Sequence, residues 1–169
     1  MNWSSNMKGK IQSKKGFSLV EMLTAVLLLS LMVGFVGGGV VVVRDAYENI
    51  TLRAEARTLL STTITSISTE LSQVKDISQE SSTCYFYHTG RKYRMSLQNK
   101  NGNIYIVSDV GENSIPLLTK QTLTRGLTPT IKQLTFDTTS GLFHCSIEIY
   151  YNDSVYETQE IYIRPMNES

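Results

Sequence analysis

The chain has 169 residues, of which 41% are apolar and 18% are charged, with 16 basic residues against 15 acidic ones. This length accommodates one modest domain, and the apolar share excludes a disordered tail protein. A net charge of +1 offers no basic excess for phosphate binding, so nucleic acid is not a default partner.

Charge and hydropathy are both concentrated at the N-terminus. Residues 1–16 carry four lysines and no acid, which leaves 12 basic and 15 acidic residues, or −3, in the rest of the chain. Residues 17–43 then form an apolar run in which Glu21 is the only ionisable side chain. A helix of that length, about 40 Å, can cross a hydrocarbon core of about 30 Å. The lysines before it predict a cytoplasmic N-terminus and an exported body.

Neither common membrane signal accounts for this run. A secretory signal peptide has a shorter apolar region that ends in a small-residue cleavage site, which this sequence lacks. An uncleaved signal anchor has the right length but does not explain Glu21. A carboxylate costs about 2.5–3.5 kcal/mol near the bilayer centre, and at the position of Glu21, nearer the edge, the cost is lower but still unfavourable. An intramembrane carboxylate is therefore a hypothesis of function that requires a named partner.

The junction before the apolar run carries a recognisable motif. Residues 14–23 are KKGFSLVEML, in which Lys14 and Lys15 precede Gly16, Phe17 follows, and Glu21 lies four residues further on. This motif resembles the processing site of type IV pilins and the related pseudopilins. The resemblance implies that prepilin peptidase/N-methyltransferase removes the basic leader, residues 1–16, by cutting between Gly16 and Phe17, and then methylates the Phe17 amine.

The resemblance also implies how such a protein assembles. Cleavage frees an α-amino group on Phe17, and the Glu21 carboxylate would pair with that amine on a neighbouring subunit of a filament. Snorkelling of Glu21 towards the lipid headgroups is the alternative explanation. The implied partners are other pilin or pseudopilin subunits, the peptidase, the pilus assembly machinery and the membrane.

Glycines interrupt the second half of the apolar run. They have two explanations: a weakened helix that can stretch on leaving lipid, since each glycine costs about 0.8–1 kcal/mol, or close helix packing. The glycines concerned are Gly34, Gly37, Gly38 and Gly39, and two of them are spaced G-x-x-x-G.

The rest of the chain predicts a helix followed by strands. Residues 44–77 lack Pro and Gly, and apolar residues at 60, 64, 67, 71 and 74 have helical spacing, so we predict helix from Phe17 to about Ile77. This helix is transmembrane over 17–43 and amphipathic over 44–80. Strand-like alternation follows within residues 81–169, at 83–88, 92–97, 103–108, 131–136, 142–151 and 154–164, with turn signals at 99–102, 137–141 and 152–153. The expected fold class is α+β, one long N-terminal helix packed on an antiparallel sheet of four to six strands, as the pilin resemblance also implies.

The only two cysteines, Cys84 and Cys145, fall in predicted strands of the exported body. A disulfide between them and two separate buried thiols both remain open. A zinc site that adds His88 and His144 is disfavoured, because His144 and Cys145 are adjacent in a strand and point to opposite faces. We predict no metal and no cofactor.

Three weaker patterns occur in the sequence. Arg91, Lys92 and Arg94 beside Tyr93 could contact DNA, but a solvated strand edge fits the body's charge of −3 better. Residues 99–103 faintly resemble a calcium loop but lack acidic ligands, and we predict a turn there. No G-x-S-x-G, P-loop or H-E-x-x-H pattern is present, so we predict no enzyme activity.

The sequence thus predicts a structural subunit, a minor pilin or pseudopilin, of a type IV pilus-like filament. It lies in the cytoplasmic membrane before assembly and at the cell surface afterwards. The alternative is an uncleaved, signal-anchored membrane protein with an exported binding domain. The sequence does not distinguish an adhesion or motility pilus from a secretion pseudopilus or a DNA-uptake filament.

Overall fold

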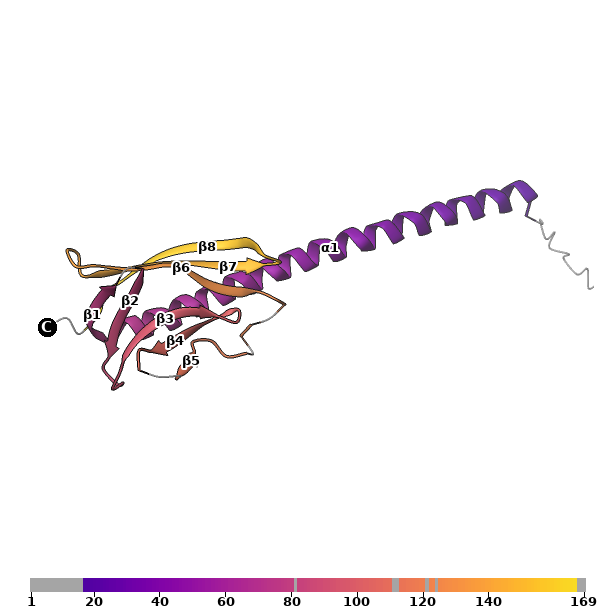
Figure 1. The fold of residues 1–169 in the computed structure, drawn as a ribbon. Coiled ribbons are helices and arrows are strands. Elements are labelled where there is room, and N and C mark those ends of the chain that lie inside the picture. The colour runs from indigo at the N-terminus through magenta and orange to yellow at the C-terminus, as the bar shows by residue number, and fades with distance from the viewer. Residues whose placement is uncertain (1–16, 81, 111–112, 121, 124, 167–169) are drawn as a thin grey trace, which may run out of the picture. The chain divides into compact units, whose positions relative to one another are not determined.

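The computed structural model describes residues 17–80, 82–110, 113–120, 122–123 and 125–166. The chain divides into two units, residues 1–47 and residues 48–169. Helix α1 (Leu19–Ser72) contributes residues to both units, whereas strands β1 to β8 belong to the second, where they gather around the C-terminal part of α1 (Figure 1). The strands are β1 (Val74–Glu80), β2 (Thr83–His88), β3 (Arg94–Lys100), β4 (Asn103–Ser108), β5 (Ser114–Pro116), β6 (Thr128–Asp137), β7 (Leu142–Tyr151) and β8 (Ser154–Ile163).

The part of α1 in the second unit has one buried face. This stretch is rich in Thr, yet it stays helical because Thr hydroxyls bond carbonyls one turn earlier, as Thr62 does to Thr58 at 2.9 Å. Thr63 is fully buried, and its hydroxyl donates to the Leu59 carbonyl at 2.7 Å, so no polar group is left unpaired there. The buried residues recur every three or four positions: Leu52, Ala56, Leu59, Leu60, Thr63, Ile67 and Leu71.

Helix α1 ends earlier than expected. We predicted helix to about Ile77, but Val74–Glu80 is strand β1, so the segment 44–80 is not helical throughout and that prediction is wrong. Val74 is fully buried and continues the apolar spacing of the helix, which is why periodicity did not reveal the change. The strand depends on antiparallel pairing with β2, an interaction between segments that no local pattern shows.

The strands form two antiparallel sheets, where we expected one. The first has the order β1-β2-β3-β4-β5 and the second the order β6-β7-β8. The α+β class is confirmed, and all six predicted strand segments are found: three have the predicted bounds, and the other three have shifted ends. Strand β5 was missed because its three residues, which end in Pro116, are too few to show alternation.

Side chains of the first sheet cover part of the outer edge of β6. Asn99 donates from Nδ2 to the Ile131 carbonyl at 2.8 Å and accepts from the Ile131 N–H at 2.9 Å. Gln79 Oε1 accepts from the Phe136 N–H at 3.3 Å. These bonds satisfy backbone N–H and C=O groups at the edge of β6 that could otherwise pair with a further strand. The alternation of apolar and polar residues along β6 could not predict these bonds, because the groups that bind its edge are single side chains of the other sheet.

The predicted hairpin turns are confirmed. Asn101 and Gly102 have φ values of 50° and 69°, and Asn152 and Asp153 have 48° and 59°, as two-residue hairpin loops of type I′ require. A Cβ at Gly102 would also lie 3.1 Å from Thr128 Cγ2, so both backbone conformation and space favour glycine. The segment 99–103 is therefore a turn between β3 and β4.

One apolar core joins the helix to both sheets. Ile67 from α1, Phe86 from β2 and Phe143 from β7 are all fully buried in it. The ring of Phe143 also contacts Phe136 of β6, with centroids 4.9 Å apart and planes inclined by 56°. Each of these side chains faces inward from a different element, so the second unit is held together mainly by apolar burial.

Candidate processing and assembly segment

The start of α1 lies just after the predicted cleavage site. Phe17 and Ser18 precede the helix, which begins at Leu19. The Ser18 N–H donates to Glu21 Oε2 at 2.9 Å, and the Met22 N–H donates to the Ser18 carbonyl at 3.1 Å. Ser18 is thus the N-cap, and Glu21 binds back to it as in one half of a capping box. The negative charge of Glu21 is also favourable at this end of the helix dipole.

The predicted processing residues divide between described and undescribed parts of the chain. Lys14, Lys15 and Gly16 lie outside the described residues, whereas Phe17 and Glu21 lie within them, less than two turns apart. Because the Gly16–Phe17 bond precedes α1, cleavage there would leave the helix whole. The amino group so created would lie one residue before the amide that Glu21 already binds.

The helical residues of the first unit expose their apolar side chains in a single copy of the chain. The large apolar side chains from Phe17 to Val43 are at least 52% exposed. By length and composition, α1 contains the one stretch among the described residues that could cross a membrane. The hydroxyls of Thr24 and Ser30 donate to helix carbonyls at 3.0 and 2.8 Å, so they present no unpaired donor to an apolar environment.

No contact within one copy requires the glycines of this segment. A Cβ added at any of them would meet nothing within 4 Å. The helix nevertheless continues through them. Both explanations given above, close packing against another helix and a weakened helix, remain predictions. The positions are Gly34, Gly37, Gly38 and Gly39.

Comparison with known families identifies this segment. Residues 11–37 match the family model described as the prokaryotic N-terminal methylation motif. This motif is the type IV prepilin signature. The resemblance is therefore confirmed for this segment, and the signature indicates a type IV pilin-like, prepilin-type N-terminus, of the kind that anchors structural subunits in a membrane. No curated protein and no solved structure gave a match.

The second unit of the chain holds both cysteines as free, buried thiols. Of the two alternatives that the sequence left open, the structure thus has separate thiols. Burial raises the pKa of Cys84 to about 11 and that of Cys145 to about 12. Both thiols are therefore protonated at neutral pH, and a protonated thiol is a poor nucleophile and metal ligand.

The predicted basic cluster is largely paired with acids of the same chain. Arg91 Nη2 donates to Glu70 Oε1 at 3.0 Å. Arg94 bonds Glu80 at 2.6 Å and Asp109 at 3.0 Å, and these bonds, that to Glu80 foremost, raise its pKa. Two of the three cations are therefore compensated locally, which leaves less positive charge for a phosphate backbone.

A buried carboxylate on β7 was missed at the sequence level. Glu148 is only 5% exposed, and its oxygens accept from Lys132 Nζ at 2.6 Å and from the Tyr150 hydroxyl at 2.9 Å. The bond from Lys132, and next that from Tyr150, lowers the pKa of Glu148 below its usual 4.5. The available signal was an acid in the middle of the apolar run of β7, since such a residue needs partners when buried.

We expect Lys132→Met to destabilise the body more at pH 7 than at pH 3. Because the pKa of Glu148 is lowered in the folded state, its contribution to stability is present above pH 4.5 and is lost as the pH falls through the folded-state pKa. Thermal unfolding of the detergent-solubilised chain at both pH values, followed by the near-ultraviolet signal of the tyrosines, measures this. Lys75→Met, at an exposed position of β1, is the control. An equal loss at both pH values would contradict the prediction.

Proposed function

We propose that this chain is a structural subunit, a minor pilin or pseudopilin, of a type IV pilus-like filament. Prepilin peptidase cuts between Gly16 and Phe17 and methylates the new amine, and the subunit then assembles through residues 17–43. One observation carries the proposal: the methylation motif coincides with an exposed apolar segment, residues 17–43, in which Glu21 is the only ionisable side chain.

The exposed apolar surface supports both stages of this life cycle. Side chains such as Phe35, which is 80% exposed, need an apolar environment that water does not supply. Lipid provides it before assembly, and the equivalent helices of neighbouring subunits provide it in the filament. Glycines with open space around them allow such helices to approach closely.

Glu21 has the capacity for the proposed pairing. Its bond to the Ser18 N–H uses one site on Oε2, whereas a carboxylate offers about four acceptor sites. The ammonium group of Phe17 on a neighbouring copy would occupy another of them. In an apolar setting each charge is costly alone, so the pair favours the axial position at which both are neutralised.

The charges of the leader support an orientation. Lys14 and Lys15 lie directly before the apolar helix and hold the N-terminus in the cytoplasm. The two-sheet body is then exported and forms the filament surface. Its partners are other pilin subunits and the assembly machinery, and genes adjacent to this one would identify the type of filament.

Mass spectrometry of the protein from native membranes and sheared filaments tests the proposal. We expect a mature chain that begins at methylated Phe17 in both fractions, and we expect the Gly16→Leu variant to keep its leader and to stay in the membrane. An intact lysine-rich leader on the wild-type chain, or a trimmed chain absent from filaments, would contradict the proposal. The first outcome would favour an uncleaved signal-anchored protein.

A further inference from the structure

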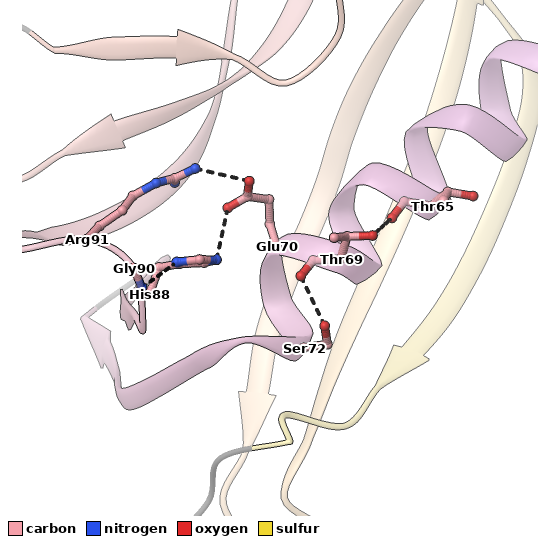
Figure 2. Close-up of polar contacts among 7 residues, drawn as sticks. All are labelled: Thr65, Thr69, Glu70, Ser72, His88, Gly90 and Arg91. Atoms are coloured by element: carbon pink, nitrogen blue, oxygen red, sulfur yellow. Dashed lines mark hydrogen bonds and ion pairs between the residues drawn. The ribbon is translucent and has the colours of Figure 1, made fainter.

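A polar cluster fastens the loop between β2 and β3, residues 89–93, to the end of α1 (Figure 2). Glu70 lies in the last turn of the helix, where a negative charge is unfavourable and no basic residue of the helix compensates it. Arg91 binds its Oε1 at 3.0 Å, and His88 Nε2 lies 3.8 Å from its Oε2. The loop is also tied to the helix end by the Thr89 N–H, which donates to the Gln73 carbonyl at 3.0 Å.

The contacts of His88 define its neutral state. Its Nδ1 accepts from the Gly90 N–H at 3.0 Å, so this nitrogen carries no proton and the ring proton sits on Nε2, facing Glu70. The distance of 3.8 Å is too long for a hydrogen bond. Glu70 Oε2 is buried, and no hydrogen-bond partner contacts it among the described residues. The carboxylate is thus satisfied on one oxygen only.

We infer that His88 is a proton-operated latch: protonation releases Gly90 and draws the imidazole onto Glu70. A proton on Nδ1 turns the acceptor of the Gly90 N–H into a donor, so that bond breaks. The same proton gives the ring a positive charge that faces the unsatisfied Oε2, which it can then bind directly. One hydrogen bond inside the loop is exchanged for one charge-assisted bond to the helix.

Charged groups lie on each element next to His88, namely α1, the loop, β1 and β3, and of these Lys92 of the loop and Asp76 of β1 are exposed. From α1 and the loop, Glu70 and Arg91 contact it directly. On β1, Lys75 is exposed and lies opposite Tyr87. On β3, Arg94 also lies opposite Tyr87, and it is bound to Glu80 and Asp109. Glu70 is therefore the acid that a charged His88 would approach.

The loop that the latch holds also lines a surface hollow. Arg91, Lys92 and Tyr93 form one wall of a cavity of about 520 Å³, and Met95 and Ile115 form part of another. The Arg91 N–H also donates to the His88 carbonyl at 2.9 Å, so this wall is joined directly to the backbone of His88. The latch therefore acts beside an exposed surface of the body, whether or not the chain assembles.

Nuclear magnetic resonance of the full chain in detergent micelles, titrated from about pH 8 to pH 5, tests the latch across the range in which histidines gain a proton. We expect His88 to carry its proton on Nε2 at pH 8. As the ring charges, exchange of the Gly90 amide, corrected for its intrinsic pH dependence, should accelerate about fivefold, the value of one typical hydrogen bond. Nuclear Overhauser contacts between the ring and the Glu70 side chain should strengthen over the same step.

Three variants separate the latch from general effects of acid. His88→Gln removes the titrating ring and should abolish the Gly90 step, whereas His144→Gln removes the other histidine and should leave it intact. Glu70→Gln should retain the Gly90 step, because Nδ1 still gains a proton, but the ring should not move closer to residue 70. An Nδ1-protonated ring at pH 8, a Gly90 amide indifferent to pH, or a step that survives His88→Gln would overturn the inference.

Discussion

We expect Glu21→Gln to be cleaved and methylated normally but to enter filaments at least about tenfold less than the wild type. The amide oxygen can still accept from the Ser18 N–H, so the helix cap survives, but the variant has no charge to neutralise the Phe17 amine of a neighbouring subunit. An unpaired charge in an apolar environment costs a few kcal/mol, and 1.4 kcal/mol is a factor of ten. The ratio of mature subunit in sheared filaments to that in membranes measures the effect.

Ser18→Ala and Glu21→Leu complete the comparison. Ser18→Ala keeps both the backbone donor and the Glu21 carboxylate and should assemble as the wild type does. Glu21→Leu removes both cap and charge and should be no worse than Glu21→Gln if the charge is what matters. Wild-type incorporation of Glu21→Gln together with failure of Glu21→Leu would assign the residue to the helix cap alone and end the pairing argument.

The N-terminal segment could be predicted because its signals are local. The Gly16–Phe17 junction, the lysines before it and the lone Glu21 are adjacent in sequence, and the family match covers the same residues. The cap bond from Ser18 was not foreseen, although a Ser three residues before a Glu at the start of an apolar run is a known helix-start pattern.

The arrangement of the body was less predictable because its decisive contacts are long-range. Alternation identified the main strands, but at the edge of β6 the first sheet contributes side-chain bonds from Asn99 and Gln79, at separations of 32 and 57 residues, where a continuous sheet would have strand pairing. The end of α1 depends on pairing with β2. Neither leaves a periodic trace in the sequence, so helix spacing was extended too far and one sheet was expected where there are two.

The polar clusters show the same limit. Glu70, on an amphipathic helix, and Glu148, in an apolar strand, look unrelated in sequence, yet each is largely buried and held by a cation from a distant segment, Arg91 and Lys132 respectively. Their partners follow from the tertiary fold. A local motif thus accounts for the first unit, whereas the second unit depends on packing between distant segments.

Because the second unit depends on packing, truncation of a core side chain should destabilise it. We expect Phe143→Ala to lower the unfolding free energy of the body by about 3–5 kcal/mol, a large share of the 5–15 kcal/mol typical of a domain. Phe143 is fully buried, and its ring packs against that of Phe136 with the two centroids 4.9 Å apart. Truncation therefore leaves a cavity between β6 and β7. Thermal unfolding followed by near-ultraviolet circular dichroism should show a midpoint lower by about 10 °C or more.

The same variant should still be processed, because the motif at residues 11–37 lies in the other unit. Phe143→Leu, which keeps most of the volume, should lose less than about 1.5 kcal/mol, and Val155→Ala, at a half-exposed site, should change stability by about 0.5 kcal/mol or less. A membrane-bound Phe143→Ala chain that is trimmed at Phe17 but absent from filaments would show that cleavage needs only the local motif and assembly needs the folded body. Loss of trimming in that variant would contradict the independence of the two units.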